Sequence, residues 1–178
     1  MNLRDRPLAF IDVETTGLTA ERHEIIEVAV VLQRRDKTVE EWCTRVRPTR
    51  PEVAEPKALE VNGYAAHPER WADAPVFSQV AAELAQRLEG AILVGHNIGF
   101  DCAFLREEFL RCGSDFRVPH RKLDTYTLAY EHLACKGLDS LSLHAVCAFL
   151  GISNEDSHTA LVDARRCRAV WNALVPGC

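Results

Sequence analysis

Two carboxylates interrupt an apolar stretch near the start of the chain. Residues 8–14 read LAFIDVE, and the apolar side chains predict a buried β-strand. Because side chains alternate faces along a strand, Asp12 and Glu14 point the same way, about 7 Å apart. They repel each other, and burial adds a desolvation cost of several kcal/mol for each. Carboxylate oxygens placed in this way are candidate ligands for a hard divalent cation.

Two further carboxylates and a histidine share this unusual setting. Asp101 starts a predicted helix whose same face carries Phe104 and Leu105. Asp163 lies on the apolar stripe of the last predicted helix, and His158 stands at the start of that helix. Charged residues in apolar stripes are local violations of the folding pattern, and such violations mark candidate functional sites.

Each of these residues also has an ordinary structural explanation. Asp101 and Asp163 could interact with the helix dipole in a first turn, and Asp12 or Glu14 could form a buried ion pair. His158 could be a satisfied polar residue at a helix start. None of these explains why four carboxylates and a histidine all occupy apolar settings at the ends of elements. A metal site does, because two divalent cations neutralise the repulsion between the carboxylates.

The surrounding pattern predicts one α/β domain. The first third reads as strands at residues 8–14, 25–32 and 39–46, with a polar hairpin turn at 34–37. After a proline-marked loop at 49–56, helices and strands alternate. Strands are expected at 91–95 and 122–124, and helices at 59–64, 75–88 (with Pro75 in the first turn), 98–112, 125–132, 141–150 and 158–174. This order predicts a mixed sheet in a single domain covering residues 1–178.

Composition narrows the class of protein. The chain has 178 residues, 47% of them hydrophobic, which is enough for one full core. No apolar run approaches the ~20 residues of a membrane span, and the first residues do not resemble a signal peptide. We therefore expect a soluble cytoplasmic protein with no membrane contact, and no tail after the last helix that could dock a partner.

The net charge of −5 argues against nonspecific coating of nucleic acid, although it leaves binding of one strand end open. Two Mg²⁺ ions would bring the net charge to −1. Basic residues cluster at 45–50 and 117–122, either as solvated surface or as local contacts for a polyanion.

The seven cysteines are an odd number and contain no CxxC pair, which predicts reduced thiols. Two HxxC pairs, His132 with Cys135 and His144 with Cys147, have a spacing that could hold zinc. Both pairs fall in helical segments with apolar neighbours, so zinc is the minor alternative.

Three segments resemble the motifs of a known family. DVETTGL at residues 12–18, GHNIGFDCAFL at 95–105 and HTALVDA at 158–164 resemble the three motifs of the DEDDh family, the DnaQ-like 3′→5′ exonucleases. The likeness continues in HEIIEVAVV, LDTYTLA and DSLSLHAVCAFLGI, and runs from about residue 8 to 174. The pattern looks closest to the branch that includes proofreading exonucleases of bacterial DNA polymerases. It implies a ribonuclease H-like α/β fold, a mixed five-stranded sheet flanked by helices.

The resemblance also implies a role for each unusual residue. Asp12, Glu14 and Asp163 would hold the tighter of two Mg²⁺ ions, with Mn²⁺ expected to substitute. Asp12 would bridge to the second ion, and Asp101 would support that ion through water. His158 would act as general base on the attacking water, because the unperturbed pKa of histidine is ~6.5.

Contacts to substrate are expected from seven residues. By resemblance, Thr15 would contact the terminal nucleotide and Leu18 would wedge beside its base, while Gly17 lets a strand end come close. Aromatic side chains stack on bases of single strands, so Phe100 and Phe104 could line the path, with Phe104 equally a core residue. The full set of expected substrate contacts is Thr15, Gly17, Leu18, His96, Asn97, Phe100 and Phe104, of which His96 and Asn97 could instead support the site or cap a helix.

The predicted activity is metal-dependent 3′→5′ hydrolysis of single-stranded or frayed DNA, with release of nucleoside 5′-monophosphates. A 3′→5′ exoribonuclease, acting on short oligoribonucleotides or RNA tails, is the alternative. A catalytically inactive binding module and a ribonuclease H-type endonuclease are further alternatives; the intact ligand set disfavours the first and the H-x4-D ending the second. The expected partner is the 3′ end of a DNA or RNA strand. A polymerase or repair protein as a second partner, and the oligomeric state, stay open.

Overall fold

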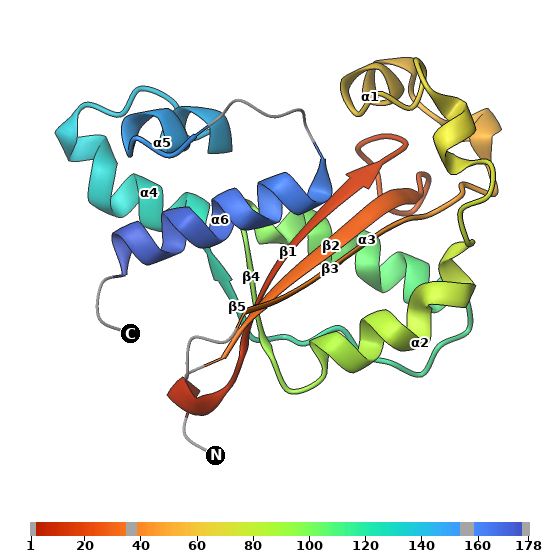
Figure 1. Ribbon diagram of the computed structural model, residues 1–178, viewed down its shortest axis with the longest axis horizontal. Helices are drawn as coiled ribbons and strands as arrows, with labels where there is room; N and C mark the ends of the chain where they lie inside the picture. Colours follow the sequence, from red (N-terminus) through yellow and green to blue (C-terminus); the bar gives the residue numbers. More distant parts are fainter. Residues whose placement is uncertain (1–2, 35–38, 154–158, 176–178) are drawn as a thin grey trace.

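A mixed five-stranded sheet forms the centre of the protein (Figure 1). A computed structural model describes residues 3–34, 39–153 and 159–175. The strands lie in the order β3-β2-β1-β4-β5. β1 pairs antiparallel with β2 and parallel with β4, β2 pairs antiparallel with β3, and β4 pairs parallel with β5. The predicted mixed α/β sheet is therefore confirmed.

The strands lie close to their predicted positions. Their bounds are β1 Leu8–Thr15, β2 Ile25–Gln33, β3 Val39–Arg45, β4 Ile92–Gly95 and β5 Lys122–Asp124. The pairing of β2 with β3 confirms the predicted hairpin, while most of its turn lies outside the described residues. The register of β1 on β2 shifts between Glu14 and Thr15, where the partner changes from Glu27 to Ile25. This β-bulge bends the end of the strand that carries the paired carboxylates.

The helices agree with the predictions in number and type over the described residues, with shifts at their starts. Their bounds are α1 Pro56–Val61, α2 Phe77–Leu88, α3 Ile98–Arg111, α4 Thr125–Leu133, α5 Leu143–Phe149 and α6 Ala160–Leu174. Short 3₁₀ turns, which were not predicted, occur at η1 Leu3–Asp5, η2 Pro51–Val53, η3 Pro68–Trp71 and η4 Ala134–Lys136.

Three of these starts differ from the prediction for identifiable reasons. α1 begins three residues early because Pro56 suits the first helical position. The placement of Pro75 in the first turn of α2 was wrong: Val76 is the N-cap, and its N–H donates to the side chain of Gln79. α5 begins late because Ser142 caps it, accepting from the N–H of Ala145.

The two faces of the sheet carry different helices (Figure 1). α6 packs along one face, over β1, β2 and β4, whereas α2 and α3 cover the other. Along β1, Phe10 belongs to the α6 side of the core, and Ile11 and Val13 belong to the α2/α3 side. The alternation of the strand therefore turns Asp12 and Glu14 toward α6. Within the described residues, no helix combines the length and hydrophobicity that crossing a bilayer requires.

Candidate active site

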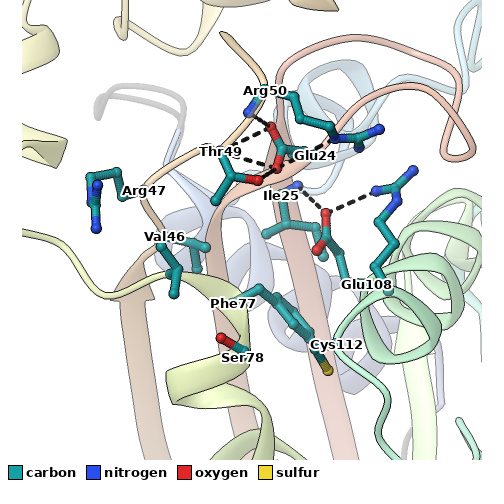
Figure 2. Close-up of a pocket in the computed structure, with 12 residues that line it drawn as sticks. Glu24, Ile25, Val46, Arg47, Thr49, Arg50, Phe77, Ser78, Glu108 and Cys112 are labelled. Carbon is teal, nitrogen blue, oxygen red and sulfur yellow. Dashed lines mark hydrogen bonds and ion pairs between the residues drawn. The ribbon is translucent and has the colours of Figure 1, made fainter.

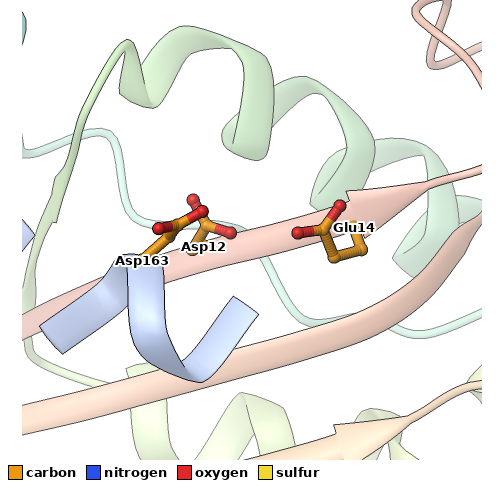
Figure 3. Close-up of side chains that lie close together, drawn as sticks. All are labelled: Asp12, Glu14 and Asp163. Carbon is orange, nitrogen blue, oxygen red and sulfur yellow. The ribbon is translucent and has the colours of Figure 1, made fainter. Parts of the chain in front are cut away.

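Three carboxylates from two distant segments meet at the end of β1 (Figure 3). Asp12 and Glu14 come from β1, and Asp163 comes from α6. Each offers one oxygen, and these three oxygens lie within 4.8 Å of one another. A spacing of this order lets three carboxylates ligate one hard cation.

Local structure brings Asp163 to the strand. Thr159 caps α6, its hydroxyl oxygen accepting from the N–H of Val162 at 3.5 Å, so the helix starts beside the sheet. Ala160 and Ala164 are fully buried against the α6 face of the sheet. Their small side chains let the first turn of the helix approach β1 closely, which places Asp163 beside Asp12.

Burial and neighbouring carboxylates disfavour the charged forms of Asp12 and Glu14. Burial raises the pKa of Glu14 to about 8, with Asp163, Glu27 and Asp101 adding to the rise. Burial, followed by the charge of Asp101, likewise raises the pKa of Asp12 well above its ordinary value. The charged forms of these carboxylates are therefore unfavourable unless a cation is bound. The donor set and its charge fit one or more divalent metal ions.

A cation of the chain already contacts one member of the cluster. Arg166, one turn after Asp163, donates from Nη1 to Asp163 Oδ1 at 2.8 Å. Both side chains are largely buried. This ion pair restrains the position of the Asp163 carboxylate. Sequence reasoning did not single out Arg166, although its place one turn after Asp163 is the usual spacing for such a pair.

Asp101 lies beside the cluster but outside the group of three. It is 4% exposed in the first turn of α3, and its Oδ1 accepts from the backbone N–H of Val13 at 3.1 Å. Burial raises its pKa to about 7, against the lowering effect of that hydrogen bond. The bond ties the start of α3 to β1 between the two strand carboxylates. His158, the predicted general base, lies outside the described residues.

The predicted substrate contacts after β1 fall into two kinds. Thr15 is buried, and its hydroxyl donates to the carbonyl of Gly17 at 2.7 Å. Gly17 is buried against a histidine: a Cβ there would lie 2.6 Å from three ring atoms of His23. Leu18 is 73% exposed. Of these three predicted contacts, Leu18 alone presents its side chain to solvent.

His96 and Asn97 shape the start of α3. Nε2 of His96 donates to the carbonyl of Leu141 at 2.7 Å, and Nδ1 lies 3.0 Å from the hydroxyl oxygen of Thr125, which itself donates to the carbonyl of Gly95. Burial lowers the pKa of His96, which favours the neutral ring. Asn97 is the N-cap residue in the left-handed region (φ 67°), and its N–H donates to Asp124. The contacts of both residues are structural, which fits the alternative that they support the site or cap the helix.

The two predicted aromatic contacts also differ. Phe100 is half-buried, whereas Phe104 is 1% exposed and belongs to the core between the sheet and α3. Their ring centroids are 4.8 Å apart. Phe104 therefore occupies the core position that was the alternative to a base contact, because its ring is enclosed by core side chains.

Glu27 is a buried carboxylate that sequence reasoning missed. It lies directly opposite Glu14 in the register of β1 and β2 and is 6% exposed. The signal was present, since a glutamate interrupts the apolar run IIEVAVVL in the same way that Asp12 interrupts its strand. The zinc alternative gains no support: over the described residues, the group Asp12, Glu14 and Asp163 is the one cluster of three or more metal-ligating side chains.

Comparisons with known proteins agree with this geometry. The family described as Exonuclease matches residues 9–170. The chain belongs to this family. Membership in the exonuclease family makes it a 3′–5′ exonuclease-type hydrolase and confirms the resemblance read from the three motifs.

Among curated relatives in the exonuclease family, the chain is 34% identical over 187 residues to DNA polymerase III subunit epsilon of Escherichia coli, covering 94% of this chain and 70% of the relative. It is 27% identical over 164 residues to the protein of the same name from Treponema pallidum, covering 92% and 74%. A PolC-type DNA polymerase III of Thermotoga maritima is 35% identical over 162 residues, which is 90% of this chain but 11% of that protein.

Among solved structures, E. coli exonuclease I in complex with a dT13 oligonucleotide superposes with a TM-score of 0.81 at 19% identity. The match covers 97% of this chain and 41% of exonuclease I, so this chain spans about two fifths of that protein. A product-bound exonuclease I gives a TM-score of 0.79 at 18% identity, covering 96% and 43%. These superpositions confirm the expected ribonuclease H-like fold.

Proposed function

We propose that this exonuclease removes nucleotides one at a time from the 3′ end of single-stranded or frayed DNA and releases nucleoside 5′-monophosphates. The observation that carries the proposal is the meeting of Asp12, Glu14 and Asp163 within 4.8 Å at the end of β1 in a chain of the exonuclease family. The choice of DNA is supported by relatives that are named as subunits of DNA polymerase III.

Each unusual residue has a role in this proposal. Asp12, Glu14 and Asp163 would hold Mg²⁺, with Asp12 shared between two ions and Asp101 supporting the second through water. Bound divalent cations supply a more acidic water and relieve charge on the phosphate. His158 takes the proton from the attacking water. Arg166 orients the carboxylate of Asp163, since it is already hydrogen-bonded to it.

The substrate end is held by few side chains. Leu18 is an exposed apolar side chain in the turn that follows the carboxylate-bearing strand, and it would pack beside the last base. Phe100 remains a candidate for stacking because it is partly exposed. Thr15, Gly17, His96 and Asn97 would instead act by holding the backbone in place. The terminal phosphate is thereby presented to the carboxylates.

A time course on 5′-labelled single-stranded DNA and RNA of one sequence tests the proposal. Each reaction is run with Mg²⁺, with Mn²⁺ and with chelator, beside Asp12→Ala and beside Asp73→Ala, an exposed aspartate far along the chain. We expect a DNA ladder that shortens from the 3′ end, is absent with chelator and in Asp12→Ala, and is unchanged in Asp73→Ala. Full activity of purified Asp12→Ala would refute the mechanism. Faster shortening of RNA would transfer the proposal to an exoribonuclease, and cleavage of a circular strand would indicate an endonuclease.

We further propose that residues 1–178 work in the cytoplasm as one exonuclease domain beside a DNA polymerase, because two relatives are named as polymerase subunits. Gel filtration of the chain mixed with the replicative polymerase of its own cell is the test. Co-elution at micromolar concentration supports the assembly, and separate elution at that concentration rejects it.

A further inference from the structure

The turn between β1 and β2 carries the exposed Leu18 and is closed by its own hydrogen bonds. The N–H of Thr16 donates to the carbonyl of Glu24 at 2.9 Å, and the N–H of Glu24 donates to the Thr16 hydroxyl at 2.9 Å. These bonds join the two ends of the turn. The side chain of Leu18 stands outside it, 73% exposed.

His23 fills the inside of this turn. Its ring is 1% exposed, and Nδ1 accepts from the backbone N–H of Thr19 at 3.0 Å. The backbone N–H of His23 donates to the carbonyl of the same threonine at 2.8 Å. The ring lies so close to Gly17 that a Cβ there would clash with three of its atoms. Because Nδ1 is an acceptor, the ring proton sits on Nε2, which lies 3.4 Å from Glu55 Oε1.

Arginine and threonine side chains hold the outside of the turn. Arg111, the last residue of α3, donates to the carbonyls of His23 at 2.8 Å and Ala20 at 2.5 Å. Figure 2 shows the carboxylate of Glu24 held by the hydroxyl of Thr49 at 2.6 Å and by the backbone N–H of Arg50 at 2.7 Å. The turn is therefore fixed by hydrogen bonds on both sides, and its backbone keeps the side chain of Leu18 exposed to solvent.

We propose that His23 is a positioning residue of the exonuclease. Its ring and Nδ1 fix the conformation of the turn, and this conformation holds Leu18 in the position in which it contacts the 3′-terminal nucleotide. The inference rests on the proposed function, in which Leu18 packs beside the last base. A side chain held in its binding position before substrate arrives binds more tightly, because less freedom is lost on association. His23 thus acts on substrate affinity through Leu18 and leaves the carboxylates unaffected.

The test compares four variants with the wild type on a 5′-fluorescein single-stranded DNA. His23→Leu keeps bulk and removes the acceptor, whereas His23→Asn keeps an oxygen near the position of Nδ1. Leu18→Ala removes the apolar contact with the last base, and the double variant combines this substitution with His23→Leu. Measurements are kcat and KM with Mg²⁺, Kd by fluorescence anisotropy with Ca²⁺ in place of Mg²⁺, and the rise in Tm on adding metal.

We expect His23→Leu to raise KM and Kd about tenfold, the effect of losing one apolar contact, with kcat within about threefold. His23→Asn stays within about threefold of wild type in KM. The double variant binds no more weakly than Leu18→Ala, because the two residues act through one contact. The metal-induced rise in Tm is unchanged in every variant. His120→Leu, at an exposed histidine in another loop, serves as control.

Independent, additive effects of His23→Leu and Leu18→Ala would overturn the inference, as would a fall in kcat with KM unchanged. A failure of the wild type to bind DNA would also overturn it. Binding of DNA that depends on His23 and Leu18 as expected, but without any hydrolysis, would support the positioning role and reject the proposed function. The two hypotheses can therefore fail separately.

Discussion

Glu27 of β2 lies directly opposite Glu14 of β1, and the two glutamates share the sheet face covered by α6. Like charges directly opposite each other destabilise an antiparallel pair. Among the described contacts of Glu27, Arg45 Nε lies 3.9 Å away and the thiol of Cys43 donates to it at 3.5 Å. The sheet therefore carries a repulsive pair beside the three-carboxylate cluster, and this arrangement has consequences for stability.

Replacing Glu27 with glutamine should stabilise the metal-free protein. The substitution removes the charge facing Glu14 and keeps the side-chain shape, so we expect a gain of up to about 1 kcal/mol, or about 2–4 °C in Tm. Thermal unfolding in chelator measures it, with Glu52→Gln on η2 as the exposed control. A Tm lower than that of the wild type would show that the bonds of Glu27 to Arg45 and Cys43 outweigh the repulsion.

The metal-free protein should lose stability as the pH rises from 6.5 to 8. Burial raises the pKa of Glu14 to about 8 and of Asp101 to about 7, and raises that of Asp12 in the same direction. In this window the folded chain keeps protons that the unfolded chain has released, so the free energy of unfolding falls, by about 1–3 kcal/mol.

The window starts at pH 6.5 because of His96, whose pKa is lowered by burial. Below about pH 6.5 the unfolded chain binds a proton at this histidine that the folded chain does not, which would lower stability as the pH falls. Urea denaturation in chelator at pH 6.5, 7, 7.5 and 8 tests the fall. Saturating Mg²⁺ should flatten it, because bound cations favour the charged carboxylates. Stability that is constant or rising without metal would contradict the assigned pKa directions.

Asp12→Asn should separate stability from activity. The neutral amide removes the most crowded charge of the cluster, so Tm in chelator rises, while the rise on adding Mg²⁺ largely disappears. Loss of a metal ligand removes several kcal/mol of transition-state stabilisation, which corresponds to at least about a thousandfold loss of rate. Calorimetry and the ladder assay on one preparation check both effects. Lower stability together with retained metal binding would count against a metal-ligand role.

Gly17→Ala should destabilise the protein through His23. The new Cβ would lie 2.6 Å from three ring atoms, and such overpacking costs about 1–3 kcal/mol. Gly99→Ala is the matched control, since no atom lies within 4 Å of a Cβ there and alanine favours the helix. Denaturant midpoints measure both. Equal midpoints for Gly17→Ala and wild type would mean that the turn can relax, which the bonds around it oppose.

Phe100→Ala and Phe104→Ala should have opposite signatures. Phe104 is enclosed in the core, so its truncation costs about 3–5 kcal/mol of stability with KM for DNA little changed in the folded fraction. Phe100 is only partly buried, so its truncation costs less stability and raises KM through the loss of stacking on the bases. Unfolding and KM measured on both variants distinguish the roles.

Local pattern was sufficient to predict the strands and to mark Asp12, Glu14 and Asp163 as candidate metal ligands, whereas the grouping of these three around one ion was implied by the resemblance to the exonuclease family. Period-two alternation placed Asp12 and Glu14 on one face, and the apolar stripe of the last helix pointed Asp163 the same way. Placing each carboxylate on its element needed only the geometry of one strand and one helix. The order of the elements then allowed few sheets other than a mixed one.

Features that depend on register or on enclosure could not be predicted in the same way. Glu27 faces Glu14 only because of how β2 pairs with β1, including the bulge after Glu14, and no residue type encodes that pairing by itself. A phenylalanine such as Phe104 is equally suited to the core and to stacking on a base, so its residue type does not decide between the two roles. His23 acquires its contacts only when the turn closes around it. The start of α2 was missed because the side chain of Gln79 moved the cap to Val76.

The helix α3 connects to the site at both ends. Near its start Asp101 accepts from Val13, and at its last residue Arg111 holds the carbonyls of Ala20 and His23. Asp101 and Arg111 are ten positions apart along the helix, which corresponds to about 15 Å, and each added or removed residue would rotate Arg111 by about 100° around the helix axis. An insertion or deletion within α3 should therefore break one of these two contacts, whereas a change of length in the loop at 113–121 leaves both in place.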